Sequence, residues 1–154
     1  MILHLKNHYL NISLFKDKNP MIYITRREHF SSSHILNNPA LSVEENQDMF
    51  GKCNSFHGHN YYMEVTLAGE PDPKSGYVMD LKVLKTIIND SILKTVDHSF
   101  LNDLEIFKGI IPTTENMSTV FWNILQKEIK LPNARLFSIK LFETEKNFVE
   151  YKGE

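Results

Sequence analysis

The sequence contains a single cysteine, Cys53, among its 154 residues. One thiol excludes an intramolecular disulfide and a zinc site built from several cysteines. An excess of charge of one sign is also missing, because 17 Lys and Arg residues nearly balance 19 Asp and Glu residues and leave a formal net charge of −2. Proteins that bind nucleic acid by neutralising its backbone are normally basic, so the composition disfavours that class.

Long hydrophobic runs are absent as well. No apolar stretch approaches the roughly 20 residues that a membrane helix needs, so no membrane partner is expected. Residues 1–20 have no arginine, no long apolar core and no small-residue cleavage pattern, and they do not resemble a signal peptide. We therefore expect a cytoplasmic protein with an N-terminal tail over residues 1–20 and one domain over residues 21–154.

The hydrophobic periodicity predicts an α+β fold. Alternation with a period of two predicts four strands, at residues 21–34, 57–69, 136–145 and 147–152. Apolar stripes with helical spacing predict two helices, at residues 80–96 and 114–130, with Asp80 and Thr114 as their N-caps. Residues 37–56 are expected to form a long loop with one helical turn. Two helices covering one face of an antiparallel sheet is the layer arrangement that this order favours.

The strongest local pattern is His57-Gly58-His59. Residues i and i+2 of a strand point to the same face, so both imidazoles share a face with Tyr61. A catalytic zinc ion typically takes three protein ligands and keeps a fourth position open, and His34 at the end of the first predicted strand is placed to be the third ligand. The alternative is that these histidines are ordinary polar residues of a half-exposed strand.

Cys53 precedes His57 by four positions and has three possible roles. As a fourth zinc ligand it would close the site and make it structural. As a base beside the metal, its thiol would be acidified by the nearby cation. As a small buried hydrophobic residue it would only fill space, although its polar neighbours Gly51, Lys52 and Asn54 make that role less favourable.

Three further groups carry possible chemistry. Asp97-His98 pairs a carboxylate with an imidazole, as in a proton shuttle, although both residues also favour helix ends. Glu143 has the parity of Phe137, Ile139 and Leu141, so its carboxylate is expected on the apolar face, where it needs either an internal Lys or Arg or a ligand with two parallel N–H donors. Thr113, Thr114 and Glu115 open the second predicted helix and either cap it or present hydroxyl and N–H groups to a ligand.

Taken together, these blocks resemble the 6-pyruvoyltetrahydropterin synthase and 6-carboxytetrahydropterin synthase family over residues 21–154. The blocks that carry the resemblance are Phe30-Ser31-Ser32-Ser33-His34, Phe50-Gly51-Lys52-Cys53 running into His57-Gly58-His59-Asn60-Tyr61, Gly76-Tyr77-Val78-Met79-Asp80-Leu81, Asp97-His98, Thr113-Thr114-Glu115-Asn116, and Phe142-Glu143-Thr144 ahead of Asn147. Each block alone is weak, but their joint occurrence in this order is highly specific.

The resemblance implies a tunnelling fold, in which a four-stranded antiparallel sheet carries two helices on one face. It implies that three subunits close a barrel and that two such trimers form a homo-hexamer. The implied substrate is 7,8-dihydroneopterin triphosphate, with Zn2+ held by His34, His57 and His59. In the implied site, Cys53 accepts a proton, Asp97 and His98 form a relay, and Glu143 anchors the pterin. Arg26, Arg27 and Lys52 are candidates for binding the triphosphate.

Two sequence features point to different branches of this family. The Cys-x3-His-Gly-His spacing resembles bacterial 6-carboxytetrahydropterin synthases of queuosine biosynthesis, because the vertebrate-like 6-pyruvoyl enzymes have two more residues there. The loop containing Leu41-Ser42-Val43-Glu44-Glu45-Asn46 resembles the pyruvoyl branch instead. The spacing lies at the expected base, so the 6-carboxy activity is the first expectation and 6-pyruvoyl synthase activity is the alternative. A zinc- or pterin-binding relative without catalysis is a further alternative, which the presence of Cys53 and Asp97-His98 disfavours.

Overall fold

The structure, a computed structural model, describes residues 20–154. One mixed sheet runs through it in the order β3-β1-β2-β4-β5. Its strands are β1 (Ile22–His34), β2 (His57–Gly69), β3 (Ser99–Phe100), β4 (Ala134–Phe142) and β5 (Phe148–Tyr151). The four longer strands pair in antiparallel fashion, as predicted. The two-residue strand β3 adds a parallel partner at Ser32 and Ser33, which the sequence did not reveal.

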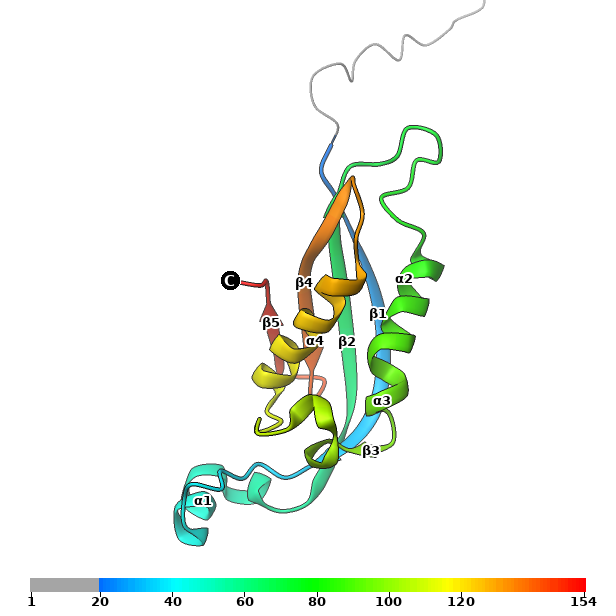
Figure 1. The fold of residues 1–154 in the computed structure, drawn as a ribbon. Helices are drawn as coiled ribbons and strands as arrows, with labels where there is room; N and C mark the ends of the chain where they lie inside the picture. Colours follow the sequence, from blue (N-terminus) through cyan, green and yellow to red (C-terminus); the bar gives the residue numbers. More distant parts are fainter. Residues whose placement is uncertain (1–19) are drawn as a thin grey trace, which may run out of the picture.

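Both predicted helices are present and cover the same face of the sheet (Figure 1). The first runs from α2 (Leu81–Ile88) through a π turn at Asn89–Leu93 into α3 (Lys94–Val96), with Asp80 as its N-cap. The second is α4 (Thr114–Glu128). Its N-cap is Thr113 and not the predicted Thr114, because the Thr113 side chain accepts a hydrogen bond from the Asn116 amide. None of the helices within residues 20–154 is long and apolar enough to cross a membrane.

The region between β1 and β2 is more ordered than the expected loop. It contains α1 (Val43–Phe50), followed by a 3-10 turn over Gly51–Asn54. Ser42 and Glu45 form a capping box, in which the Ser42 hydroxyl accepts from the Glu45 amide and the Glu45 carboxylate accepts from the Ser42 amide. This connecting segment projects from the end of the sheet and leads back into β2 at His57 (Figure 1). Short 3-10 turns at Leu101–Asp103 and Glu105–Phe107 precede α4.

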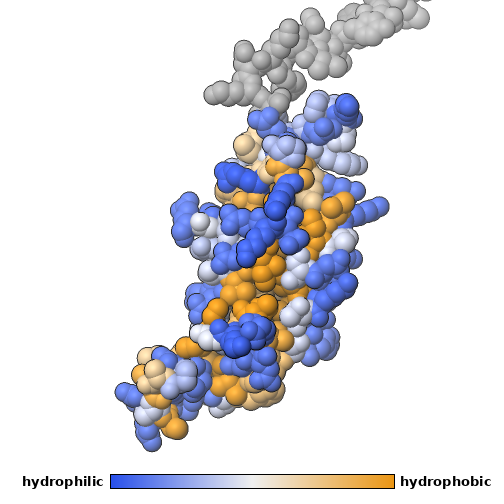
Figure 2. All heavy atoms as spheres, viewed as in Figure 1, coloured by the Kyte–Doolittle hydropathy of each residue, from blue (hydrophilic) through white to orange (hydrophobic). Residues whose placement is uncertain are grey.

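The core lies between the helices and the face of the sheet that they cover, called the inner face below. From β2 it receives the fully buried Tyr61, Met63, Val65 and Leu67, as the alternation predicted. Figure 2 shows hydrophobic side chains along this side of the molecule, flanked by hydrophilic ones. Side chains alternate between the two faces along the whole of β2. The histidines at its start therefore lie on the same inner face as this core.

One predicted orientation is wrong. A bulge between β2 and β4 pairs Thr66 with Ser138 but Leu67 with Leu136, so Phe137 has no direct partner on β2. Phe137 is therefore turned to the outer face, where its ring contacts Tyr23 at a centroid distance of 4.7 Å. An extra residue in one strand shifts the alternation, which no period-two count along the sequence reveals. Ile139 and Leu141, beyond the bulge, are fully buried as predicted.

Candidate metal centre and ligand pocket

The pairing of β1 with β2 brings the three candidate ligands together. His34 lies opposite His57, and His59 lies opposite Ser32 in the same ladder. One nitrogen from each of His34, His57 and His59 lies within 4.8 Å of the other two. The three imidazoles thus form one cluster at the end of the sheet, as the sequence predicted.

The tautomers of two of these histidines are set by backbone carbonyls. His34 Nδ1 donates to the Pro112 carbonyl at 2.9 Å, and His57 Nδ1 donates to the Ser55 carbonyl at 2.7 Å. Each Nε2 then carries a lone pair, yet these two nitrogens lie only 3.1 Å apart. Two lone pairs repel at that distance unless a cation or proton lies between them. Backbone carbonyls on the outer nitrogens are the supports that metal-binding histidines commonly have.

Burial disfavours the protonated form of His34 and of His59. Desolvation is the main cause that lowers the pKa of His34 and of His59, and the neighbouring imidazoles lower both further. The Nε2 atom of His59 is buried and has no hydrogen-bond partner within residues 20–154. Neutral imidazoles with inward lone pairs and an unpaired buried nitrogen fit a zinc site with three histidine ligands.

Glu143 connects the histidine cluster to a cavity. Its Oε1 lies 3.6 Å from His59 Nε2 and 3.9 Å from His34 Nε2, and it accepts a hydrogen bond from the Thr114 hydroxyl at 3.2 Å. Burial lowers the pKa of both imidazoles although the Glu143 carboxylate raises it, so these contacts are weaker than ion pairs with permanently charged groups. Among residues 20–154, Glu143 makes no ion pair with a Lys or Arg, so the internal salt bridge considered from the sequence is not formed.

The cavity has a volume of about 410 Å³ and brings together several predicted residues. Cys53, Thr113, Thr114, Glu115 and Glu143 all line it. Leu36, Phe50, Asn147, Phe148 and Val149 complete its walls. All of them except Asn147 are apolar, and the two phenylalanines offer flat faces. In the sequence only Phe50 and Asn147 belonged to the family blocks, and the other three had no distinguishing pattern.

Cys53 is exposed, so it is not a buried space-filling residue. It also lies outside the group of mutually close ligand atoms, which within residues 20–154 consists of the three histidines alone. It lines the same cavity as Glu143, so of the three roles considered from the sequence the role of a base is the one left open.

Asp97 and His98 are not brought to this cavity. The Asp97 carboxylate accepts from the Ser31 amide at 2.9 Å and contacts His98 Nδ1 at 3.0 Å, and the Ser31 amide is the main cause that lowers the Asp97 pKa. The His98 side chain is 82% exposed, and its backbone has a positive φ of 56°. His98 lines a different cavity at the edge of β1, together with Ser31, Asn60 and His59 of the histidine cluster, and Asp97 lines neither cavity.

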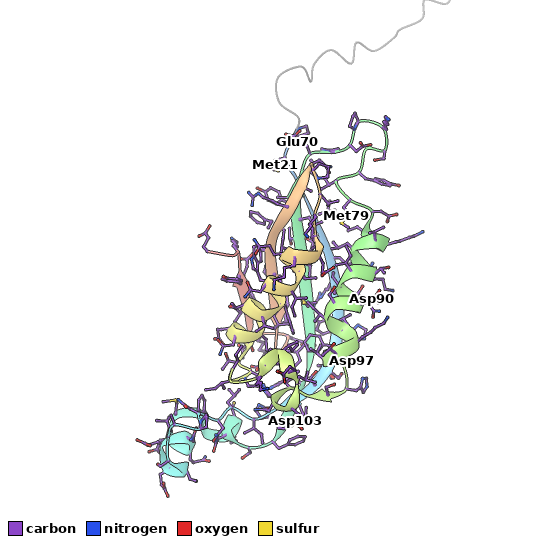
Figure 3. The ribbon with its side chains drawn as sticks, in the orientation of Figure 1. Met21, Glu70, Met79, Asp90, Asp97 and Asp103 are labelled. Carbon is purple, nitrogen blue, oxygen red and sulfur yellow. The ribbon has the colours of Figure 1, made fainter. Side chains whose placement is uncertain are left out.

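The three basic candidates for the triphosphate are also separated. Arg26 binds the Glu28 carboxylate at 2.6 Å and lines a cavity with Met79, which Figure 3 shows toward the end of the molecule opposite to Asp97. Arg27 lies on the outer face, 4.5 Å above the Tyr62 ring. Only Lys52, the neighbour of Cys53 in the 3-10 turn, is close in the chain to a residue of the candidate pocket.

In the comparisons with known proteins, the matching family model, relatives and solved structure are all pterin synthases. The family model described as 6-pyruvoyl tetrahydropterin synthase matches residues 23–154. The 6-pyruvoyl tetrahydrobiopterin synthase of Homo sapiens is 45% identical over 134 residues, covering 85% of this chain and 91% of that protein. A 6-carboxy-5,6,7,8-tetrahydropterin synthase of Rickettsia conorii is 31% identical over 147 residues, covering 84% and 99%. The structure of Caenorhabditis elegans 6-pyruvoyl tetrahydropterin synthase superposes with a TM-score of 0.82 at 40% identity, covering 88% of this chain and 97% of that one.

Gly58 offers a test of how the strand pairing supports the histidine cluster. A Cβ at Gly58 would lie 2.9 Å from the Ser32 carbonyl oxygen, so Gly58→Ala must push β2 away from β1 beside His57 and His59. We expect the affinity for zinc to fall by about 10-fold, as it does when supports of metal ligands are lost. Competition against a chromophoric chelator measures it. Asn60→Ala, on the same outer side of β2, is the matched control and is expected to bind zinc as the wild type does. A zinc affinity of Gly58→Ala equal to that of the control would contradict this view.

Proposed function

This chain belongs to the 6-pyruvoyl tetrahydropterin synthase family, and we propose that it is a zinc-dependent lyase that eliminates triphosphate from 7,8-dihydroneopterin triphosphate to give a 6-pyruvoyl tetrahydropterin. The main support for the proposal is that the three-histidine cluster adjoins a cavity lined by the Glu143 carboxylate and the Cys53 thiol. Metal, base and ring anchor are the three elements that such a reaction needs.

The relatives favour this branch over the one first expected from the sequence. The similarity to the human 6-pyruvoyl enzyme, 45% identical, exceeds that to the Rickettsia 6-carboxy enzyme, 31% identical. The preference for the queuosine branch relied on one loop spacing, and loops accept small insertions and deletions more easily than strands and helices do. The 6-carboxy activity is retained as the second candidate because the Cys-x3-His-Gly-His spacing still favours it.

In this proposal, His34, His57 and His59 hold zinc through their Nε2 atoms. Bound there, zinc would stabilise negative charge that develops on oxygen atoms of the substrate side chain. Imidazole ligands carry no negative charge, so they would leave the charge of the ion undiminished. The Pro112 and Ser55 carbonyls hold the two Nδ1 protons and so leave the Nε2 atoms of His34 and His57 free to bind the metal.

Glu143 and the start of α4 orient the pterin ring. A carboxylate accepts the ring N–H and the neighbouring amino group together, which fixes orientation more strongly than one bond does. The Thr114 hydroxyl already donates to Glu143 Oε1 and so restrains its rotamer. Thr113 and Glu115 line the same cavity at the N-terminus of α4, where the helix dipole favours negative charge.

Cys53 takes a proton from the carbon skeleton of the substrate side chain. A thiolate is the reactive form, and a nearby cation stabilises it. The exposed position of Cys53 on the cavity wall permits contact with a ligand. Lys52, the preceding residue, supplies a positive charge for the triphosphate at the same turn.

Asp97 and His98 return a proton, but from a second copy of the chain. Within one chain His98 lines a cavity at the β1 edge, and neither residue lines the cavity with Cys53. Apart from β3 at Ser32 and Ser33, the outer edge of β1 has no strand partner within residues 20–154, and β5 leaves the opposite edge free as well. Free edges of this kind pair readily with other chains. We therefore retain the trimer barrel and the homo-hexamer as parts of the proposal.

The reaction products decide between the two branches. Zinc-loaded protein incubated with 7,8-dihydroneopterin triphosphate is expected to release inorganic triphosphate together with a pyruvoyl pterin, measured by mass spectrometry. Release of acetaldehyde together with a carboxypterin would instead select the 6-carboxy activity. Absence of turnover by protein with bound zinc would favour a relative that binds pterin without catalysis.

Cys53→Ala tests the base. Because Cys53 lies outside the ligand group, the variant is expected to keep its zinc, while turnover falls by about 10²–10⁴-fold, the usual contribution of a positioned base. Zinc stoichiometry and turnover are measured on the same preparation. Met49→Ala, an exposed change in the preceding helix α1, is the control. Loss of zinc in the cysteine variant would indicate a fourth ligand and a structural site.

Glu143→Gln tests the ring anchor. The amide replaces one acceptor oxygen with a donor, so we expect pterin affinity to fall by roughly 10-fold or more while zinc stays bound, as for the loss of a charge-assisted hydrogen bond. Titration calorimetry with a dihydropterin measures this affinity. Glu145→Gln, an exposed change in the turn between β4 and β5, is the matched control. Unchanged binding in the Glu143 variant would assign its carboxylate a structural role.

A further inference from the structure

Tyr61 lies at the boundary between the core and the histidine cluster. It follows His59 by two residues on the inner face of β2 and pairs with Phe30 of β1. Its side chain is fully buried. The ring stacks on Phe30 at a centroid distance of 4.9 Å with an interplanar angle of 13°, and it meets the rings of His59 at 5.5 Å and His34 at 6.2 Å. These contacts hold the ring in one position.

Packing explains the ring of Tyr61 but not its hydroxyl. Among the buried side-chain nitrogen and oxygen atoms of residues 20–154, only two have no hydrogen-bond partner, and these are the Tyr61 hydroxyl and His59 Nε2. Phenylalanine would make the same ring contacts without burying an unpaired donor, which carries a free-energy cost. Such a group in a native site needs an explanation, and a partner supplied by a ligand is one.

The groups around the hydroxyl narrow the choice of ligand. Tyr62 pairs with Phe142, so continuing this register by one residue places Tyr61 opposite Glu143. The Glu143 carboxylate already accepts from Thr114, and the His34 and His57 Nδ1 atoms already donate to carbonyls. The Tyr61 ring therefore lies beside the histidine rings, and within residues 20–154 its hydroxyl makes no hydrogen bond to them or to Glu143.

We propose that the Tyr61 hydroxyl donates a hydrogen bond to an oxygen on the side chain of the bound dihydropterin. This inference rests on the proposed function, because it assumes that Glu143 holds the ring and that the side chain extends toward the three histidines. Tyr61 then discriminates between ligands by the substituent of the ring. It binds a hydroxylated side chain and contributes nothing to a ligand that has no oxygen there.

Two probes with the same ring test the inference. Dihydroneopterin carries a hydroxylated side chain, and 6-methyl-7,8-dihydropterin carries no side-chain oxygen. With the full zinc-loaded chain, Tyr61→Phe is expected to weaken binding of dihydroneopterin by roughly 3- to 10-fold and to leave binding of the methyl compound unchanged, as measured by titration calorimetry. The thermal midpoint of the ligand-free variant is expected to equal or exceed that of the wild type, because a buried unpaired hydroxyl is removed.

Tyr62→Phe is the matched control, because it removes the same hydroxyl from the next residue of β2, on the outer face. It is expected to bind both probes as the wild type does. Equal binding of dihydroneopterin by Tyr61→Phe and the wild type, which a trapped water on the hydroxyl would produce, overturns the inference and leaves the proposed function intact. A lower thermal midpoint of ligand-free Tyr61→Phe also overturns it, since the partner would then be in the protein. Failure of the wild type to bind either probe would remove the proposed function and this inference together.

Discussion

The antiparallel pairing of β1 with β2 is the constraint on which the site depends. The two strands, each of 13 residues, pair along their whole length and end with His34 opposite His57. Because side chains alternate along a strand, a slip of one residue would turn His57 and His59 to the outer face and expose Met63 and Val65. The burial of the apolar residues therefore fixes the register, and the register in turn fixes the histidines. Hydrophobic packing along the sheet thus determines the geometry of the polar cluster at its end.

Most of the fold and the main ligands were predictable from the sequence because they follow from periodicity. Strand β2 begins and ends as predicted, and the Asp80 cap marks the start of α2. The errors occur where local chemistry interrupts a period. The bulge at Thr66 turned Phe137 outward, and the Asn116 amide moved the cap of α4 to Thr113. Strand β3 was missed because two residues are too few to show any alternation.

The residues of the candidate site also fall into two groups, those whose positions follow from the predicted strands and turns and those whose positions do not. The three histidines lie together and Cys53 and Glu143 line one cavity, since strand ends and a short turn place them. The position of Asp97 and His98 was not predictable, because it depends on backbone bonds between Ser31 and the end of α3. The branch of the family was inferred from one loop spacing, whereas similarity along the whole domain favours the other branch. A loop length reports on one turn, while identity over 134 residues reports on every element of the fold.

Within residues 20–154, the two buried side-chain atoms without a hydrogen-bond partner both lie at the histidine end of β2. The core along β2 buries apolar side chains, whereas the two inner-face positions that follow His57 carry His59 Nε2 and the Tyr61 hydroxyl, which have no hydrogen-bond partner. Next to them, the lone pairs of His34 and His57 face each other at 3.1 Å. Each of these features costs stability in the empty protein. A cation at the three imidazoles and an oxygen at the phenol would relieve all of them at once. Binding of such groups would therefore stabilise the folded chain, because the free energy recovered from these groups is available only in the folded state.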